Sequence, residues 1–484
     1  MSVTSLSFDP SGIQLDPRGG LSRQLYQALR ERVLDGRLPS NTRLPASRDL
    51  ARTLGISRNS VVRAYDQLYA EGFIESRVGD GTYIAKLSTA PKKPPQPASH
   101  EVIPSPAETL VAPAISTGPP RAFRVGIAAF DLFPFTLWAQ LQARFWRNPD
   151  PALLGYADAM GDKRLREMIA AYLRGARGLH CDAGQIIITN GAQQAISLCG
   201  QVLLKPGNDV AVENPGYRSA VSALSEAGGR PVGIPVDNQG LDCAELLKAE
   251  GCRLVYVTPS HQYPSGVTMS LARRLELLEW AKQRDGYIIE DDYDSEYRYS
   301  GAPLAPLAAL DQQGRVLYVG TFSKVAFPGL RLGFLLLPPG LVAEFARRRG
   351  AEVRHSEIGT QQVMAEFMAA GHFQRHIRRM RRAARSRLLA LQEAWPVDIP
   401  GCAPFPTIEA GLHLSMPVDN HEREAELVDK ARAAGVEINR LTDYWLRDSN
   451  VPVDKRAGLV LGFAGVNEVA IKKAVAELRR VWRV

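Results

Sequence analysis

The residues with the clearest chemical potential lie in one short segment, Gly320–Gly333. The apolar, β-branched run Val316–Val319 precedes it and predicts a short buried strand. Lys324 lies close to the end of this strand among apolar neighbours, where an amine loses its proton easily and can form an imine with an aldehyde. Arg331 follows a Pro-Gly turn and offers a planar fork that suits a phosphate. An aldehyde and a phosphate at this separation describe pyridoxal phosphate (PLP).

An isolated Ser-Lys pair would more often be part of a surface loop, so the spacing of the whole segment matters. The order Thr321, Ser323, Lys324, Arg331 resembles the cofactor-lysine segment of fold-type I aminotransferases. This resemblance implies that the lysine bonds to PLP and that the two hydroxyls and the arginine contact its phosphate.

A second segment of the same region predicts a phosphate site. From Arg121 onward, predicted strands and helices alternate, a pattern typical of a mostly parallel sheet with helices on both faces. The run Gln185–Thr189 predicts a strand, and a glycine turn then opens a helix at Ala192 and Gln193. The first turn of a helix presents free N–H groups and a positive dipole end to a phosphate. By the same resemblance this helix start binds the cofactor phosphate, and Tyr217 stacks on the pyridine ring.

The most acidic patch of the chain lies at the end of the predicted strand in Tyr287–Asp294. Carboxylates at a strand end can bind a metal, but this segment resembles the one whose aspartate pairs with the pyridine nitrogen of PLP. A carboxylate there keeps the nitrogen protonated, which makes the ring an electron sink. By spacing we assign Asp291 to the nitrogen and Tyr293 to the ring hydroxyl. Asp292 and Asp294 are alternatives for the carboxylate.

The segment Gly155–Gly161 resembles the one through which a neighbouring subunit contacts the cofactor phosphate. If Tyr156 makes this contact, the domain is a homodimer, and the family implies a head-to-tail arrangement. The other interpretation is a core tyrosine that precedes a helix.

The first eighty-odd residues predict three helices and a hairpin. Apolar residues at helical spacing mark Leu21–Leu34, Ser47 predicts the cap of a helix over Arg48–Leu54, and Ser57 predicts the cap of a third helix. Two helices joined by a tight glycine turn form a helix-turn-helix. The turn Gly79–Gly81 between two short β-rich runs predicts a hairpin wing.

The pattern from Leu44 to Thr82 resembles the GntR winged-helix domain almost position by position. Asp80 departs from it, because the family usually has serine there, and this change could alter one phosphate contact. A protein-interaction module with solvated arginines is the alternative. The polar start of the third helix, nearby arginines and the wing are expected to contact bases or phosphates of double-stranded DNA. These residues are Arg48, Ser57, Arg58, Asn59, Ser60, Arg63, Gly79, Gly81 and Thr82.

The chain is expected to contain two folded domains and a linker. Residues 87–120 are rich in proline, which favours an extended, semi-rigid tether. We therefore predict a multidomain protein: an α+β winged helix-turn-helix over 15–86, the linker, and an α/β fold-type I aminotransferase-like domain over 121–484 for PLP binding and dimerisation. This order of domains resembles the MocR subfamily of GntR regulators over nearly the whole chain.

Two departures from working aminotransferases argue against turnover. Their Asn-Pro-x-Gly loop has Tyr263 in place of the asparagine, and Leu459–Phe463 carries no arginine where those enzymes hold the substrate carboxylate. Loss of a bidentate arginine weakens amino-acid binding by a few kcal/mol. Arg218 or Arg440 could substitute, but we assign no catalytic residue and expect residual transaminase activity at most.

The resemblance implies a regulator that senses PLP or an amino compound, with vitamin B6 or amino-acid metabolism as candidate targets. One alternative is an active aminotransferase with a DNA-binding head. Another is a DNA-binding protein whose large domain only dimerises. The arginine-rich stretch Arg375–Arg387 is either a second DNA-contacting surface or a solvated helix that flanks the dimer interface.

Composition limits the remaining function classes. The net charge of +8 over 484 residues permits a nucleic-acid partner without requiring one. Five cysteines without a CxxC pair indicate reduced thiols and predict neither a disulfide framework nor a metal site. We expect no signal peptide, because the first residues lack a basic stretch followed by an apolar core, and no apolar run reaches the roughly twenty residues that a membrane helix needs. We expect a cytoplasmic protein.

Overall fold

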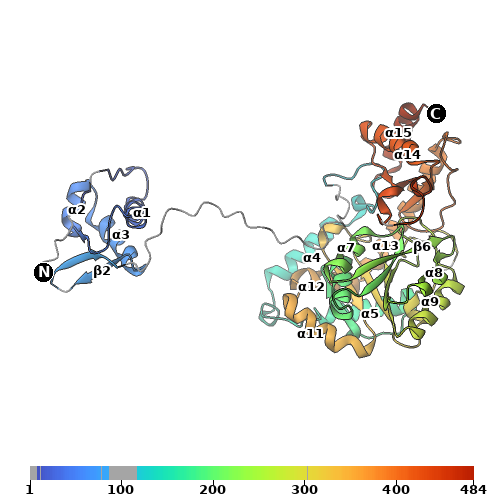
Figure 1. The fold of residues 1–484 in the computed structure, drawn as a ribbon, viewed down its shortest axis with the longest axis horizontal. Helices are drawn as coiled ribbons and strands as arrows, with labels where there is room; N and C mark the ends of the chain where they lie inside the picture. Colours follow the sequence, from blue (N-terminus) through green and yellow to red (C-terminus); the bar gives the residue numbers. More distant parts are fainter. Residues whose placement is uncertain are drawn as a thin grey trace. The chain divides into compact units, whose positions relative to one another are not determined.

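The structure is a computed structural model that describes residues 8–10, 12–77, 79–86, 117–301, 304–447 and 449–483. The chain divides into two compact units, Met1–Ile103 and Pro104–Val484, which are drawn in Figure 1. Of the predicted linker, 87–120, only residues 117–120 are described, so most of that prediction lies outside the described residues.

The N-terminal unit is a three-helix bundle with a small antiparallel sheet. Its strands follow the order β1-β3-β2, and the hairpin β2–β3 is the predicted wing. Leu25, Leu29, Val61 and Leu68 lie in its core and are fully buried. The short strand β1 was not predicted, because two residues show no periodicity. The elements in chain order are α1 (Leu21–Leu34), β1 (Arg43–Leu44), α2 (Ser47–Leu54), α3 (Arg58–Ala70), β2 (Ile74–Arg77) and β3 (Gly81–Ile84).

The two predicted serine caps differ. The Oγ atom of Ser57 accepts a hydrogen bond from the Ser60 N–H at 3.1 Å, so Ser57 caps α3. The prediction for Ser47 was wrong: Ser47 is the first helical residue, and Ala46 is the N-cap without a side-chain bond. The Ala46 carbonyl already accepts from the Leu50 N–H, which starts the helix one residue earlier than predicted.

This difference predicts different effects of the two serine-to-alanine changes. Ser57→Ala should destabilise the winged-helix unit by about 1 kcal/mol, because the capped N–H loses its acceptor. Ser47→Ala should change the free energy of unfolding by less than about 0.5 kcal/mol. Denaturant unfolding of each variant, with hydrogen exchange in α3 as the probe, would measure both changes in the free energy of unfolding. Equal losses would contradict the assignment of the caps.

The C-terminal unit is built on an eight-stranded sheet with the order β4-β11-β10-β9-β8-β5-β6-β7. The central strands β10, β9, β8, β5 and β6 are parallel, whereas β11 and β7 are antiparallel to their neighbours. These strands are β4 (Ile186–Thr189), β5 (Asp209–Asn214), β6 (Arg230–Asp237), β7 (Gly240–Leu241), β8 (Leu254–Val257), β9 (Tyr287–Asp292), β10 (Val316–Thr321) and β11 (Gly333–Leu336).

Helices cover both faces of this sheet, as the alternating pattern predicts (Figure 1). Successive side chains of a strand point to opposite faces. Leu317 and Ile289 therefore pack on the face of α6, and Val316 and Ile288 pack on the face of α9. The helices of the large lobe are α4 (Phe135–Arg147), α5 (Lys163–Arg177), α6 (Ala192–Leu203), α7 (Arg218–Glu226), α8 (Cys243–Lys248), α9 (Leu271–Gln283), α10 (Leu307–Leu310), α11 (Val342–Val353) and α12 (Ile358–Ala369).

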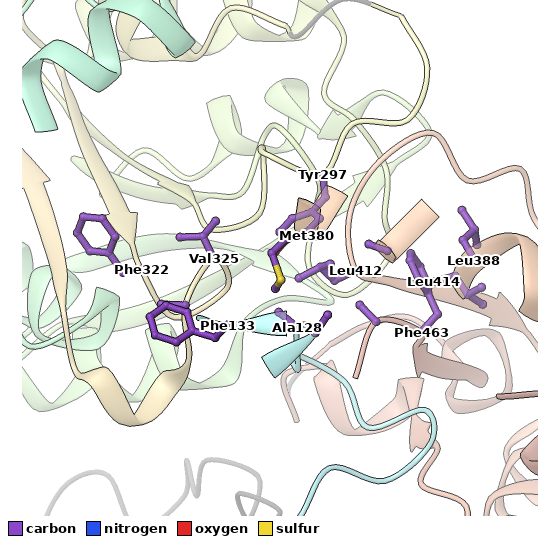
Figure 2. Packing of buried hydrophobic residues seen from close by; sticks show 14 of the residues in the cluster. Ala128, Phe133, Tyr297, Phe322, Val325, Met380, Leu388, Leu412, Leu414 and Phe463 are labelled. Carbon is purple, nitrogen blue, oxygen red and sulfur yellow. The ribbon is translucent and has the colours of Figure 1, made fainter. Parts of the chain in front are cut away.

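A second, three-stranded antiparallel sheet of order β12-β14-β13 completes the unit. One hydrophobic cluster joins it to the large sheet. Figure 2 shows side chains of this cluster, from Phe133 and Phe322 to Leu414 and Phe463, with Met380 of α13 between them. The elements are α13 (His372–Ala394), β12 (His413–Pro417), α14 (His421–Ala433), β13 (Asn439–Arg440), β14 (Gly458–Gly462) and α15 (Glu468–Trp482).

The arginine-rich stretch lies on α13 and presents two kinds of arginine. Arg387 is buried and donates hydrogen bonds to the Ala464 carbonyl and to Asp131, at 2.6 and 2.7 Å. Most of its other arginines are exposed: Arg375, Arg378, Arg379, Arg382 and Arg385. Arg387 therefore has a structural role, and both interpretations of the exposed arginines stay open.

Two further features concern the whole set of described residues. All five cysteine thiols are free. Among the described helices, none combines the length and the apolar character that crossing a membrane requires.

Candidate functional site

The Lys324 side chain lies just beyond the end of β10. Its Nζ donates a hydrogen bond to the Gly126 carbonyl at 2.7 Å. Burial lowers the pKa of Lys324, and the nearby carboxylates of Asp294 and Asp291 oppose this shift. The net lowering favours the neutral amine, which is the nucleophilic form.

Asp291 lies in β9 on the face of α6. The Tyr256 hydroxyl donates to its Oδ2 at 2.7 Å, and its buried Oδ1 has no hydrogen-bond partner in the described part of the chain. Burial raises the pKa of Asp291 to about 7, and Lys324 is among the charges that lower it. The Oδ1 atom is therefore a buried acceptor that lacks a donor.

Asp292 points to the opposite face of the same strand. There it forms an ion pair with Arg177 at 2.8 Å and accepts a hydrogen bond from the Tyr318 hydroxyl. Ser295 donates a further bond at 2.8 Å. Strand alternation thus separates two of the three candidate carboxylates: Asp292 belongs to a buried ion pair, whereas Asp291, like Asp294, acts on Lys324.

The predicted phosphate-binding residues are brought together by β11. Gly333 pairs with Thr189 of β4 on one side and with Thr321 of β10 on the other, which places the start of α6 beside the lysine segment. A Cβ atom on Gly333 would lie 2.9 Å from the Gly191 Cα, so only glycine allows this approach. Arg331 donates to the Asn190 carbonyl at 2.6 Å.

The start of α6 has no side-chain cap, so its first N–H groups are available to a ligand. Thr321 and Ser323 lie across from the start of α6, at the end of β10, and their hydroxyl oxygens are 3.0 Å apart. The described geometry therefore gathers Ala192, Gln193, Thr321, Ser323 and Arg331 around the same corner of the sheet.

An aromatic wall stands beside this corner. The ring of Tyr263 packs edge to face against the rings of Tyr217 and Tyr293. Its centroid lies 5.5 Å from that of Tyr217 and 6.0 Å from that of Tyr293. The Tyr293 hydroxyl donates to the His261 carbonyl at 2.8 Å. Tyr263, which replaces the asparagine of aminotransferases, therefore contributes a ring where those enzymes have an amide.

The structure adds two histidines that the sequence did not reveal. The Nδ1 of His261 lies 3.0 Å from the Asp294 Oδ2, and the His261 and His413 rings are 4.6 Å apart. His261, Asp294 and His413 are all buried, and each offers one atom that could bind a metal ion; these three atoms lie within 4.8 Å of one another. They are far apart in sequence, so no single short motif predicts that they meet.

Three candidate residues lie outside this cluster in the single chain. Tyr156 is 84% exposed, with the Arg354 guanidinium 4.9 Å above its ring, so it is not a core tyrosine. Arg440 pairs with Asp429, and Arg218 donates to the Trp445 carbonyl. These contacts do not bring either arginine to Lys324.

In the N-terminal unit, the candidate DNA contacts form an exposed polar surface. Arg58, Asn59 and Ser60 begin α3, and Gly79 and Gly81 turn the wing with φ of 76° and 124°. Arg48, Ser57 and Arg63 are exposed beside them, and Thr82 is half-buried.

Arg43 is an additional cation at this surface. Its Nε would lie 3.2 Å from a Cβ on Gly81, so the side chain packs on the wing backbone. It lies on β1, the strand that the sequence pattern did not reveal.

Comparisons with known proteins match both units. The family described as bacterial regulatory proteins, gntR family, matches residues 21–84, and aminotransferase class I and II matches residues 123–401. The probable rhizopine catabolism regulatory protein MocR of Rhizobium meliloti is 35% identical over 95% of this chain and 93% of its own length. The chain belongs to the MocR-type subfamily of GntR regulators.

Other similar proteins agree with this membership. The HTH-type pyridoxine biosynthesis transcriptional regulator PdxR of Corynebacterium glutamicum is 33% identical over 94% of both chains. A crystal structure of Pyrococcus horikoshii kynurenine aminotransferase, solved with PMP and substrates, is 28% identical with a TM-score of 0.67 over 76% of this chain and 91% of that chain. The N-terminal unit of this MocR-type regulator is a GntR-type DNA-binding domain, and its C-terminal unit has the fold-type I architecture.

Proposed function

We propose that this MocR-type regulator binds PLP covalently at Lys324 in its domain 121–484. PLP, or an amino compound that reacts with it, changes how the winged-helix domain 15–86 binds its DNA operator. The segment 87–120 tethers the two domains. A coupling of this kind requires that the ligand binds two states of the regulator with different affinity. The name of the relative PdxR supports control of vitamin B6 metabolism as one target, and amino-acid metabolism is the other.

The observation that carries the proposal is the buried Oδ1 of Asp291, which has no hydrogen-bond partner among the described residues and lies near a lysine whose pKa is lowered. A protonated pyridine nitrogen carries a charged N–H group, and this oxygen would accept a hydrogen bond from it. The uncapped start of α6 supplies the matching anion site. The donor set of the chain therefore fits both ends of PLP.

Each predicted residue has a defined role in this proposal. Lys324 forms the covalent link, Asp291 holds the nitrogen proton, and Tyr293 contacts the ring hydroxyl. Tyr217 covers the ring. The phosphate is held by Ala192, Gln193, Thr321, Ser323, Arg331 and Tyr156 of the partner subunit in a head-to-tail homodimer. When bound, PLP supplies an electrophilic carbon and an electron-withdrawing ring.

The role as a sensor rather than an enzyme follows from the substrate side of the site. Arg218 and Arg440 are engaged elsewhere, and β14 carries no arginine. We therefore propose little or no transaminase turnover, and a cytoplasmic regulator.

The experiment is an absorption titration of the full-length protein with PLP, followed by borohydride reduction and DNA-binding assays. A visible band that borohydride removes, with label on Lys324 and altered operator affinity, is the expected result. Steady transamination of amino acids would favour the enzyme alternative. No band in excess PLP would leave a domain that only dimerises.

The DNA-binding half predicts two kinds of variant. Asn59→Ala should weaken operator binding while weakening non-specific binding less, because an asparagine at the start of α3 can contact base edges. Arg63→Ala should weaken binding to all sequences and reduce its salt dependence, as expected for a phosphate contact. Binding titrations on operator and scrambled DNA at two salt concentrations would separate these effects. Equal behaviour of the two variants would contradict the assignment.

A further inference from the structure

A cavity of about 290 Å³ lies between α5, the loop that follows β9, and α13. None of the residues assigned to PLP is among those that line it. The volume is close to the lower end of the range for small-molecule sites, roughly 300–1,000 Å³. The residues that α13 contributes are spaced by three and four positions, so they share one face of the helix. They are Gln374, Ile377, Arg378 and Arg381.

The arginines that line this cavity have donor groups without acceptors. Neither Arg378 nor Arg381 forms an ion pair or a side-chain hydrogen bond with a described residue, and Arg381 is half-buried. Arg177 of α5 is buried and pairs with Asp292 at 2.8 Å, but its Nε has no acceptor in the described part of the chain. Guanidinium groups of this kind suit carboxylates, which they can bind through two parallel hydrogen bonds.

The loop after β9 adds a carboxylate to the same cavity. Glu296 is half-buried, and its Oε1 accepts a hydrogen bond from the Tyr172 hydroxyl at 2.8 Å. Glu296 forms no ion pair with any described residue, although two unpaired arginines line the cavity with it. Burial, followed by the charge of Asp292, raises the pKa of Glu296 to about 7, and a cation beside it would favour its ionised form. The cavity therefore offers both signs of charge to a ligand.

We infer that this cavity binds an acidic amino acid, whose amino group pairs with Glu296 and whose two carboxylates pair with Arg378 and Arg381. Each charge of the ligand then meets one charge of opposite sign. A dicarboxylate without an amino group would leave Glu296 facing only negative charge, and an amino acid with one carboxylate would leave one arginine unpaired. The inference does not rest on the proposed function, because binding in this cavity requires neither Lys324 nor PLP.

The test measures binding of L-glutamate and L-aspartate to the full-length protein by isothermal titration calorimetry. An amino acid could also react at Lys324, so the protein is used freed of PLP and again after incubation with PLP and borohydride. The better of the two amino acids should bind in both states. Glutarate, which lacks the amino group, and L-glutamine, which lacks the second carboxylate, should each bind about tenfold more weakly than L-glutamate.

Substitutions by glutamine remove one charge at a time from the cavity. Arg378→Gln and Arg381→Gln should each weaken binding of the acidic amino acid about tenfold. The matched control is Arg382→Gln, because Arg382 is exposed on the same helix and is not among the lining residues, so this variant should bind like the wild-type protein. Glu296→Gln keeps an oxygen for the Tyr172 hydroxyl but loses the negative charge, so it should bind L-glutamate and glutarate with similar affinity. Thermal unfolding of each variant checks that it is folded.

Several results would overturn the inference. One is the absence of binding of both acidic amino acids at millimolar concentration. Another is equal affinity for L-glutamate, glutarate and inorganic phosphate, which would indicate a general anion site. An equal loss in Arg382→Gln would show an effect of total charge only. If Arg378→Gln and Arg381→Gln weaken operator binding and leave amino-acid binding unchanged, this face of α13 contacts DNA instead. Absence of a visible band with PLP would defeat only the proposed function, because the titration of the PLP-free protein does not depend on it.

Discussion

Replacing Lys324 with alanine should abolish the imine absorption band that we expect PLP to form with this protein, together with the label that borohydride would fix on the lysine. The amine is the only part of the proposed PLP site that can form the covalent bond, and its lowered pKa makes it reactive. Loss of the amine also removes its hydrogen bond to the Gly126 carbonyl. Non-covalent PLP binding through the phosphate site should persist at reduced affinity. Absorption spectra and mass spectrometry after reduction measure the result.

The matched control is Lys163→Ala, because the Lys163 side chain is 80% exposed and its ion pair is with Glu167 on the surface of α5. This variant should keep the band and the label. Thermal unfolding should show that Lys324→Ala is folded. If operator binding by Lys324→Ala still responded to PLP as the wild-type protein does, covalent sensing would be wrong.

Changing Asp291 to asparagine should weaken PLP binding roughly 10- to 100-fold, the effect of losing a charged hydrogen-bond partner. Asparagine keeps an oxygen for the Tyr256 hydroxyl but supplies no negative charge for a protonated ring nitrogen. The free energy of unfolding should change little, because the Asp291 Oδ1 has no partner to lose among the described residues. PLP titration and denaturant unfolding measure the two quantities.

For the adjacent substitution Asp292→Asn we expect the opposite result: a large loss of stability and little effect on PLP binding. Asp292 pairs with Arg177, and both side chains are at least 94% buried, so the variant leaves an uncompensated charge. We expect a loss of stability of about 3–5 kcal/mol and little direct change in PLP affinity. Strong loss of PLP binding in Asp292→Asn, with none in Asp291→Asn, would reverse the assignment of the two carboxylates.

Much of the fold could be predicted because local patterns and long-range structure agree. The helices α1 and α3, the wing hairpin and the strands around Lys324 follow from periodicity and turn residues. The cap of α2 was misplaced because Ser47 and Ala46 differ by one position, and backbone geometry decides between them. The strand β1 is too short to carry a pattern.

The candidate site could be predicted where a short segment carries a recognisable pattern of its own. Lys324 and Arg331 share one segment, and their residue types by themselves indicate a reactive amine and an anion site. His261 and His413 come from separate segments, so their contact with Asp294 became visible only in the folded chain.

The sequence alone indicated the order of the domains and membership of the aminotransferase-like and GntR-like groups, because each depends on residue types at short spacing. The tertiary structure decided which of two adjacent carboxylates acts on Lys324, because strand alternation sends Asp291 and Asp292 to opposite faces of β9. It also decided that β12 lies beside β14, because the pairing of these two strands brings together residues that are distant in the sequence.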